Sequence, residues 1–498
     1  MNSRIKQFAI AACLSMAALS AAATEFLVVV PVKGKRGPGP DIQVTLSAAT
    51  LPAAKVGSAY SYDLKPHLLV TGDSSLDLTK STWAATSASQ LPAGLSLDAS
   101  GLISGKPNTM NEAGASFEVV STYKNKTGRQ VYVIRVDGVA LEVLQLSAGD
   151  DHTCAVTHAG GVKCWGLDDL GQLGNDAALL SKSTPVDVLG LTSGVASVSA
   201  GGQHTCAVTT AGAVRCWGRG SYGQLGNGAT ANSPTPVAVQ GLTSGVAMVS
   251  TGWAHTCAVT TAGGAKCWGR DNYGQLGDSV NLANQSVPVD VLGLTAGVTN
   301  VATGYNHTCA VTTAGGVKCW GQNDVGQLGI NSYTNKPTPA DVVGLSSAVK
   351  SVDAGYVHTC AVTTAGGVKC WGDDAVGQLG NGLPLAESLV PVDVTGLTSG
   401  VVSVAAGDSH NCALTAGGRV KCWGSNDMSQ LGNPAAPVVQ PDPLDVGLQG
   451  VSAVTAGWGH TCVTMGTRAA KCWGHNSDGQ LGINSTETSP TPVNVLPQ

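Results

Sequence analysis

A motif that recurs seven times is the strongest constraint on how this chain folds. The first copy runs from His152 to Gly174 and reads HTCAVTHAGGVKCWGLDDLGQLG. Further copies begin at His204, His255, His307, His358, His410 and His460. The first cysteines of successive copies lie 50 to 52 residues apart, so insertions between copies are almost absent. A repeat of fixed period indicates an array of equivalent structural units, which argues for architecture before chemistry.

Each copy contains four strand signals. In the first copy, alternating residues flank an Ala-Gly-Gly turn between Cys154 and Cys164, which predicts a β-hairpin. A Val-rich run such as VASVSAG precedes each hairpin, and a Pro-Val strand such as TPVDVLGL follows each Gly-Gln-Leu-Gly. Four short strands per unit are typical of a propeller blade. The sequence therefore predicts an all-β fold with a seven-bladed β-propeller over 141–498, in which the C-terminal strand at 491–498 completes the first blade.

The cysteines are paired as regularly as the motif. If His158-Ala159-Gly160 forms the hairpin loop with Gly160 left-handed, Cys154 lies opposite Cys164, within bridging distance. We therefore predict seven disulfides: Cys154–Cys164, Cys206–Cys216, Cys257–Cys267, Cys309–Cys319, Cys360–Cys370, Cys412–Cys422 and Cys462–Cys472. Of the 15 cysteines only Cys13 remains, in the N-terminal leader. This even pairing favours an oxidising compartment.

Zinc is the alternative use of these residues, because His152, Cys154 and Cys164 recur as a set in every copy. Structural zinc sites usually place paired cysteines two to four residues apart and need a fourth ligand, and no fourth ligand recurs. We expect no metal and no cofactor. The repeated histidine is predicted to be buried and bonded to nearby backbone, and the repeated Trp to pack between blades.

The order His-Thr, apolar strand, Gly, strand, Trp-Gly, Gly-Gln-Leu-Gly resembles the regulator of chromosome condensation repeat family, in its bacterial exported form. The resemblance spans 141–498 and implies a seven-bladed propeller. Copy six departs from it at Asn411 and Ser429, and copy seven in the hairpin that starts at Val463. It also implies two alternatives to a general binding role: an enzyme inhibitor of the β-lactamase-inhibitor type, and guanine-nucleotide exchange on a small GTPase, which the predicted export disfavours.

The N-terminus reads as a signal peptide over 1–23. Arg4 and Lys6 precede a largely apolar run, and small residues at 21–23 offer a cleavage site. A lipid attached to Cys13 is an alternative. No later segment is apolar for long enough to span a bilayer. We therefore expect an exported protein that is periplasmic, displayed on the cell surface or secreted.

Residues 24–40 are predicted to be a linker, because they end in the basic, Gly-Pro-rich stretch KGKRGPGP. From 41 to 138 alternating runs between turn signals predict a β-sandwich. The segment from Leu91 to Pro107, LPAGLSLDASGLISGKP, resembles the immunoglobulin-like domains of bacterial surface proteins. That resemblance implies a spacer or adhesion module.

Charge and motifs exclude several classes of function. The formal net charge is −5, which does not favour nucleic acid or an anionic membrane as a partner. The sequence has no Gly-rich phosphate loop, nucleophile elbow or HExxH motif. We therefore expect a binding protein and not an enzyme.

A binding surface is predicted where the seven copies differ. The first variable position of the Gly-x-x-His turns holds Asp150, Gly202, Trp253, Tyr305, Tyr356, Asp408 and Trp458. The aromatic residues Trp253, Tyr305, Tyr356 and Trp458 are candidate contacts for a protein or glycan, with Tyr222 and Tyr273 from the loops after Trp-Gly. Packing over strand ends is the alternative role, and whether those loops share the same rim stays open.

Overall fold

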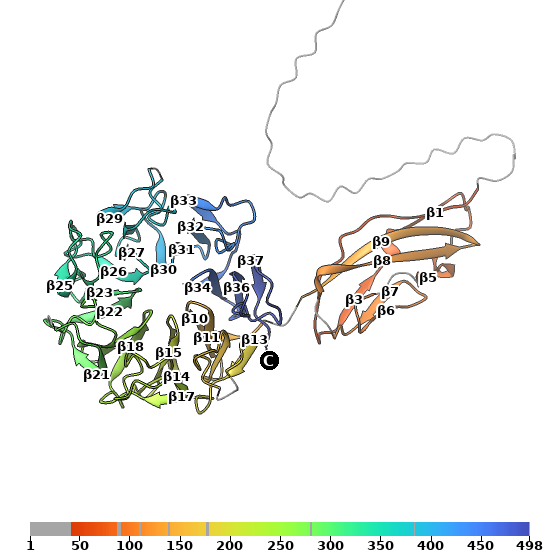
Figure 1. Cartoon of the computed structure of the whole chain (residues 1–498). Coiled ribbons are helices and arrows are strands. Elements are labelled where there is room, and N and C mark those ends of the chain that lie inside the picture. The colour runs from red at the N-terminus through yellow and green to blue at the C-terminus, as the bar shows by residue number, and fades with distance from the viewer. Residues whose placement is uncertain are drawn as a thin grey trace, which may run out of the picture.

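The computed structural model describes residues 41–86, 91–108, 111–137, 140–175, 179–278, 281–382 and 384–497. The predicted signal peptide, Cys13 and the linker at 24–40 lie outside this part of the chain. Figure 1 shows an N-terminal sandwich of strands and a ring of seven sheets. The helices described are two short 3-10 turns, η1 (Lys65–His67) and η2 (Leu78–Lys80), and no described helix has the length and apolar character needed to cross a membrane.

The sandwich is built from two main sheets and a strand pair. Its strands are β1 (Gln43–Leu46), β2 (Ala54–Lys55), β3 (Tyr60–Asp63), β4 (Leu68–Thr71), β5 (Thr82–Ala85), β6 (Leu95–Leu97), β7 (Leu102–Gly105), β8 (Asn111–Tyr123) and β9 (Lys126–Asp137). One sheet has the order β2-β9-β8-β5 and the other β3-β7-β6, while β1 pairs with β4. This arrangement confirms the predicted immunoglobulin-like β-sandwich.

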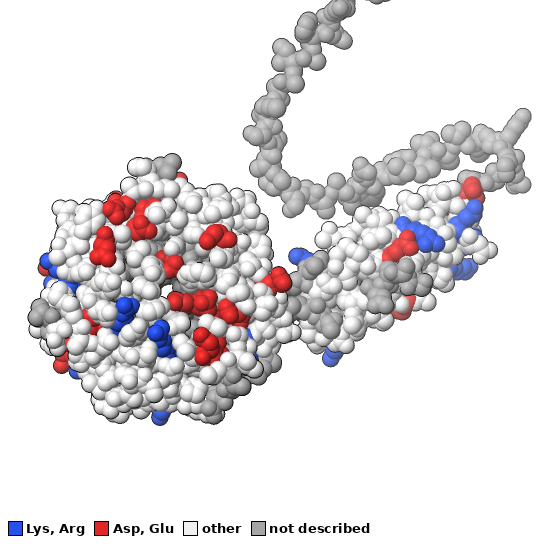
Figure 2. Space-filling view, in the orientation of Figure 1, with Lys and Arg blue, Asp and Glu red and all other residues white. Residues whose placement is uncertain are grey.

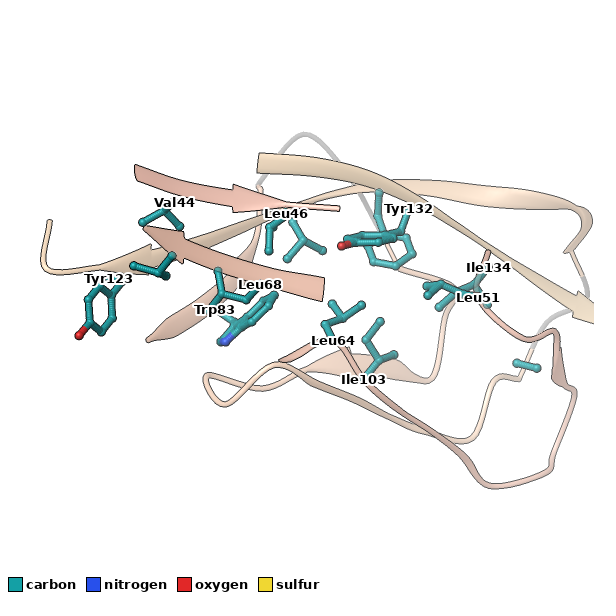
Figure 3. Packing of buried hydrophobic residues seen from close by; sticks show 14 of the residues in the cluster. Val44, Leu46, Leu51, Leu64, Leu68, Trp83, Ile103, Tyr123, Tyr132 and Ile134 are labelled. Carbon is teal, nitrogen blue, oxygen red and sulfur yellow. The ribbon is translucent and has the colours of Figure 1, made fainter. Parts of the chain in front are cut away.

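The sandwich has its own hydrophobic core, which includes Trp83 and Tyr132 (Figure 3). The turn between β6 and β7 explains the Asp-Ala-Ser-Gly sequence. The Asp98 carboxylate accepts hydrogen bonds from the backbone N–H groups of Ser100 and Leu102 at 2.8 and 3.0 Å. Gly101 has φ +93°, and a Cβ there would lie 2.9 Å from the Trp83 ring. Only glycine fits both that conformation and that approach.

The propeller consists of seven four-stranded antiparallel sheets. Each blade takes four consecutive strands, which in chain order are β10 (Val143–Ala148), β11 (His152–Thr157), β12 (Val162–Gly166), β13 (Lys182–Asp187); β14 (Val195–Ala200), β15 (His204–Thr209), β16 (Val214–Gly218), β17 (Ser233–Ala238); β18 (Val246–Thr251), β19 (His255–Thr260), β20 (Ala265–Gly269), β21 (Gln285–Asp290); β22 (Val298–Thr303), β23 (His307–Thr312), β24 (Val317–Gly321), β25 (Lys336–Asp341); β26 (Val349–Ala354), β27 (His358–Thr363), β28 (Val368–Gly372), β29 (Ser388–Asp393); β30 (Val401–Ala406), β31 (His410–Thr415), β32 (Val420–Ser425), β33 (Val439–Asp445); β34 (Val451–Ala456), β35 (His460–Met465), β36 (Ala470–Gly474), β37 (Ser489–Asn494).

The strand that closes the ring differs from our prediction. The C-terminal strand β37 pairs with β36 and completes the seventh blade, not the first. The prediction was wrong because each of the seven copies is followed by its own fourth strand, with Pro-Ala in the fourth copy and Pro-Leu in the sixth, so none is left over. The ring closes instead where residues 141–143 enter: the Leu141 N–H donates to the Val495 carbonyl at 2.7 Å, and Ala470 N–H to the Leu141 carbonyl at 2.9 Å.

The predicted hairpin register is confirmed. Cys154 lies opposite Cys164 between β11 and β12, and Gly160 has φ +78° at the turn. All seven predicted disulfides are present. In the seventh blade Arg468 occupies the glycine position and adopts φ +71°, a left-handed conformation that most side chains avoid.

Candidate functional site

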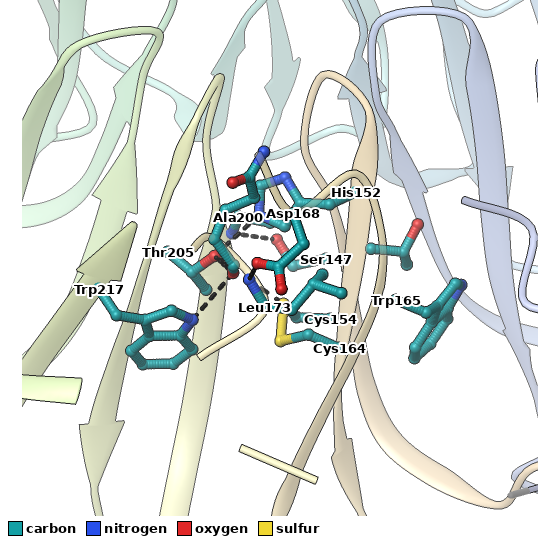
Figure 4. The surroundings of a disulfide bond; sticks show 12 residues. Ser147, His152, Cys154, Cys164, Trp165, Asp168, Leu173, Ala200, Thr205 and Trp217 are labelled. Carbon is teal, nitrogen blue, oxygen red and sulfur yellow. Dashed lines mark hydrogen bonds between the residues drawn. A yellow bond between two sulfur atoms is a disulfide. The ribbon is translucent and has the colours of Figure 1, made fainter. Parts of the chain in front are cut away.

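The recurring residues of the motif form the contacts between blades. The His152 Nε2 lies 2.8 Å from the Thr205 Oγ1 of the next blade, and that hydroxyl donates to the Gln172 carbonyl at 3.0 Å. The Trp217 Nε1 donates to the same carbonyl at 2.9 Å (Figure 4). The Thr205 hydroxyl donates its only proton to the Gln172 carbonyl, so it can only accept from His152. The His152 Nε2 must therefore be protonated and act as the donor to Thr205. The repeated His, Thr, Gln and Trp are therefore joints of the ring.

The same network runs around the whole ring. Six blades place a threonine hydroxyl against the preceding histidine, and the sixth uses Asn411. The Asn411 Oδ1 lies 3.0 Å from the His358 Nε2, while its Nδ2 donates to the Gln378 carbonyl at 2.7 Å. An amide thus supplies the acceptor and the donor that a hydroxyl supplies elsewhere. The predicted backbone partner of the histidines was wrong, because the bond crosses to a side chain of the next blade.

Burial keeps these histidines neutral. It lowers the pKa of His152 to about 4, and that of His204 to about 3 with smaller effects of His152 and Arg219. Each imidazole leaves its Nδ1 without a hydrogen-bond partner among the described residues. The cysteines that would have been zinc ligands are consumed by the disulfides. The repeated His-Cys set therefore has a structural role.

A buried acid or amide holds the Gly-Gln-Leu-Gly turn in six of the blades. The Asp168 and Asp271 carboxylates accept the backbone N–H groups of Leu173 and Leu276 at 3.0 and 2.9 Å. In blade seven Asn476 makes the same bond, and its Nδ2 also donates to two loop carbonyls at 2.9 Å. The Oδ2 atoms of the two acids have no hydrogen-bond partner among the described residues. Burial raises the pKa of Asp271 to about 7.

A polar channel runs through the centre of the ring. It encloses about 210 Å³ and is lined by the ends of the first strands, among them Ser147, Ser250 and Asp353. At the end of each first strand a glycine lies against the next blade: a Cβ at Gly149 would lie 2.4 Å from the Gly201 carbonyl oxygen. This close approach recurs in all seven blades. The residue after each of these glycines therefore lies at the mouth of the channel.

The variable residues meet at this mouth. A pocket of about 360 Å³ there is lined by Asp150, Asp151, Trp253, Tyr305, Tyr356, Asp408 and Trp458. All four aromatic residues predicted from the Gly-x-x-His turns are therefore brought together. Tyr356 and Trp458 are the most exposed of them, at 40% and 38%. The four line a hollow in the surface and do not form a packed core.

The aromatic rings form a continuous row across blades two to five. Ring centroids lie 6.3 Å apart for Tyr222 and Trp253, 4.8 Å for Trp253 and Tyr305, and 4.0 Å for Tyr305 and Tyr356. The loop after Trp-Gly in blade two therefore shares the rim with the Gly-x-x-His turns, which answers the question that the sequence left open.

Two predicted residues lie apart from this row. Trp458 packs edge-on against His475 at 5.3 Å. Tyr273 does not line the pocket and makes no ring contact among the described residues. Although it occupies the same repeat position as Tyr222, it does not join the cluster.

Charged residues complete the rim, and the sequence-based choice of site residues omitted them. The Arg219 and Arg270 guanidinium groups lie 5.4 and 5.2 Å from the centre of the Trp253 ring. Figure 2 shows acidic groups gathered around the central hollow, with basic groups on the same face. Asp150 and Asp408 occupy the same repeat position as the aromatics, and that shared position was the signal that could have identified them.

The carboxyl groups of the pocket lie in a poorly hydrated environment. Burial raises the pKa of Asp150 to about 7, with further contributions from Asp151 and Asp408. Burial also raises the pKa of Asp408 to about 6. Each deprotonated group therefore destabilises the others, because like charges are held close together in low dielectric.

A closed ring with invariant joints and a variable, concave mouth is a propeller of the protein-interaction class. The chain belongs to the RCC1-like domain family, whose model matches residues 105–463, and the RCC1 repeat model matches 451–480. The Putative Ig domain model matches 43–137, in agreement with the N-terminal sandwich.

Named relatives share the propeller. The chain is 32% identical over 297 residues to the ultraviolet-B receptor UVR8 of Arabidopsis thaliana, an alignment that covers 58% of this chain and 67% of the receptor. It is 32% identical over 318 residues to the human E3 ubiquitin-protein ligase HERC2, covering 62% of this chain but only 7% of the ligase. The chain therefore spans a small part of that relative.

Solved structures show the same fold. Human WBSCR16 is 26% identical with a TM-score of 0.58, over 67% of this chain and 88% of that one. Prp20p of Saccharomyces cerevisiae, whose structure was described together with its binding to Gsp1p and histones, is 21% identical with a TM-score of 0.59, over 72% of this chain and 87% of that one.

Proposed function

We propose that this chain is an exported or surface-displayed binding protein whose propeller mouth holds a protein or glycan ligand, with the immunoglobulin-like domain as a spacer. The observation that carries the proposal is the convergence of the variable repeat positions on one pocket. An invariant frame with a variable mouth is what a scaffold for ligand recognition requires. The role proposed is binding without catalysis.

Export is supported by two features of the sequence. The signal-peptide pattern at 1–23 would direct the chain out of the cytosol. Seven disulfides are typical of a protein that folds in an oxidising compartment. Guanine-nucleotide exchange on a small GTPase is disfavoured for the same reason, since that partner is intracellular. Inhibition of an enzyme of the β-lactamase type would be a special case of binding at this mouth.

The test is capture of ligands by the immobilised mature chain from proteins and glycans of its natural surroundings. The variant Trp253→Ala/Tyr305→Ala/Tyr356→Ala removes the aromatic row, and Tyr273→Ala is a matched control outside the pocket. Truncating one aromatic anchor typically costs about 2 kcal/mol, roughly thirtyfold in affinity. We expect the triple variant to lose its ligands and the control to keep them. A large loss of thermal stability with unchanged affinity of the folded fraction would contradict the proposal.

A further inference from the structure

The mouth pocket holds acidic groups that its own side chains do not neutralise. Among the described residues, His475 is the one basic side chain within 4 Å of a carboxylate at this mouth, with 3.8 Å between the Asp151 Oδ1 and the His475 Nδ1. The same part of the chain offers Asp150 and Asp408 no ion-pair partner, and the Asp408 carboxylate accepts only the neighbouring Ser409 hydroxyl, at 3.1 Å. The pocket therefore holds acidic side chains without a positive charge that balances them.

The two arginines of the rim are held elsewhere. Arg219 donates to Gln203 Oε1 at 2.6 Å and to Ser221 Oγ at 2.8 Å, and it lies 5.0 Å from the centre of the Tyr222 ring. Arg270 lies 5.4 Å from the same ring. These contacts place both guanidinium groups over aromatic faces instead of beside the carboxylates. The rings of Tyr222 and Trp253 thus already contact cationic groups of the protein itself.

The aromatic and acidic walls of the pocket approach each other at blade two. Gly202 stands where the other blades carry an aromatic or acidic side chain. A Cβ at Gly202 would lie 2.6 Å from the Trp253 Cδ1 and 2.9 Å from the Asp150 Oδ2. An indole and a carboxylate therefore flank the same point of the rim. A cation bound beside Asp150 would therefore lie near a negative charge and near an aromatic residue.

The chemistry of the pocket distinguishes among cations. No group of three or more His, Cys, Asp or Glu side chains in the described part of the chain is arranged to hold a metal ion. Calcium needs six to eight oxygen ligands, most of them from carboxylates, carbonyls and water, and an indole and two phenol rings do not supply such a set. An organic cation matches better, because its alkyl stem packs on rings while its charged end reaches a carboxylate. The pocket opens onto the polar channel, in which Asp353 is a further acid.

We propose that the mouth pocket binds a lysine or arginine side chain presented by a partner protein. The proposal rests on the binding function proposed above and narrows its ligand to a basic protein segment. The stem would lie along Trp253, Tyr305 and Tyr356, and the charged end would meet Asp150 and Asp408. The pocket of about 360 Å³ is large enough for one such side chain with neighbouring atoms of its backbone.

The test compares two capped tripeptides, acetyl-Gly-Lys-Gly-amide and acetyl-Gly-norleucine-Gly-amide, which have the same stem and differ in the charge. Binding to the mature chain is followed by NMR titration at low salt. We expect the lysyl peptide to bind at least tenfold more tightly. We also expect Asp150→Asn/Asp408→Asn to reduce that affinity at least tenfold, while Asp187→Asn, a control on the outer strand of blade one, leaves it unchanged.

Equal binding of the two peptides would overturn the proposal, as would full affinity in the double Asn variant. The Asn substitutions preserve shape and remove repulsion, so thermal unfolding should show a folded protein. The experiments can reject the cationic ligand and the binding function separately. If the triple aromatic variant loses the captured ligands but the peptides bind equally, the binding function stands and the cationic ligand is wrong. If neither the aromatic nor the Asn variant alters capture, both are wrong.

Discussion

His460 and Thr153 lie 307 positions apart in the sequence, and 2.8 Å separates the Nε2 of one from the Oγ1 of the other. This contact joins the last blade to the first. The same His–Thr contact joins His152 to Thr205, and it recurs at every blade boundary except the one where Asn411 faces His358. The Thr153 hydroxyl also donates to the Gln480 carbonyl at 2.8 Å. The closure of the ring therefore uses the same bonds as its other joints.

Asn411 allows this joint to be tested inside the protein. Asn411→Thr should change the free energy of unfolding by less than about 1 kcal/mol, because a hydroxyl restores the usual donor and acceptor. Asn411→Leu should cost about 1 to 3 kcal/mol, since the buried His358 Nε2–H loses its acceptor. Chemical denaturation measures both, and Thr461→Val in blade seven, which removes the acceptor of the His410 Nε2–H, should cost a similar amount. Equal stability of Asn411→Leu and wild type would show that the joint contributes nothing.

Asp271→Asn should stabilise the propeller. The Asp271 Oδ2 is buried without a partner among the described residues, whereas Asn476 at the same position uses its Nδ2 to bond two carbonyls. Because the folded-state pKa of about 7 lies above the unfolded value, wild-type stability falls as pH rises from about 4 to 7. The gain from Asp271→Asn, about 1 to 3 kcal/mol, should therefore be larger at pH 8 than at pH 5.

Thermal unfolding of the two proteins at both pH values measures this difference. The reciprocal change Asn323→Asp in blade four should destabilise and should do so more at pH 8. A gain from Asp271→Asn that is the same at pH 5 and pH 8 would contradict the role assigned to the buried charge.

Peptide mapping of the non-reduced mature protein should yield seven links, each between cysteines ten positions apart. Removing one link, as in Cys206→Ser/Cys216→Ser, should cost about 3 kcal/mol in the chain-entropy model of a short loop. Free thiols or stoichiometric zinc in protein taken from its native compartment would contradict the pairing.

Limited proteolysis tests the proposed domain boundaries. We expect the first cuts within 33–40 or near Gly138, because interdomain linkers are generally cleaved before disulfide-bridged hairpins. Mass spectrometry of the fragments should then give an intact propeller. Early cleavage inside the cysteine hairpins would argue against a closed ring.

The sequence predicted what is local and missed what depends on neighbouring blades. Gly160 and the spacing of Cys154 and Cys164 fix a hairpin register, so the disulfides could be read directly. The partner of His152 is Thr205, in another repeat, and no pattern within one copy identifies it. Tyr222 and Tyr273 hold the same repeat position, yet only Tyr222 contacts a neighbouring ring. A shared repeat position therefore does not determine which rings meet across a blade boundary.

The strand order of the blades has a consequence for how such rings arise and can be rebuilt. Every propeller sheet is formed by one uninterrupted run of sequence. The propeller fold therefore does not depend on which two blades the chain termini lie between. Linking the propeller at Leu141 to the segment after Val495, and opening the chain between two other blades, would leave all seven sheets whole. A circularly permuted propeller should therefore assemble, and one repeat unit is a self-contained module that gene duplication can copy without leaving half a sheet behind.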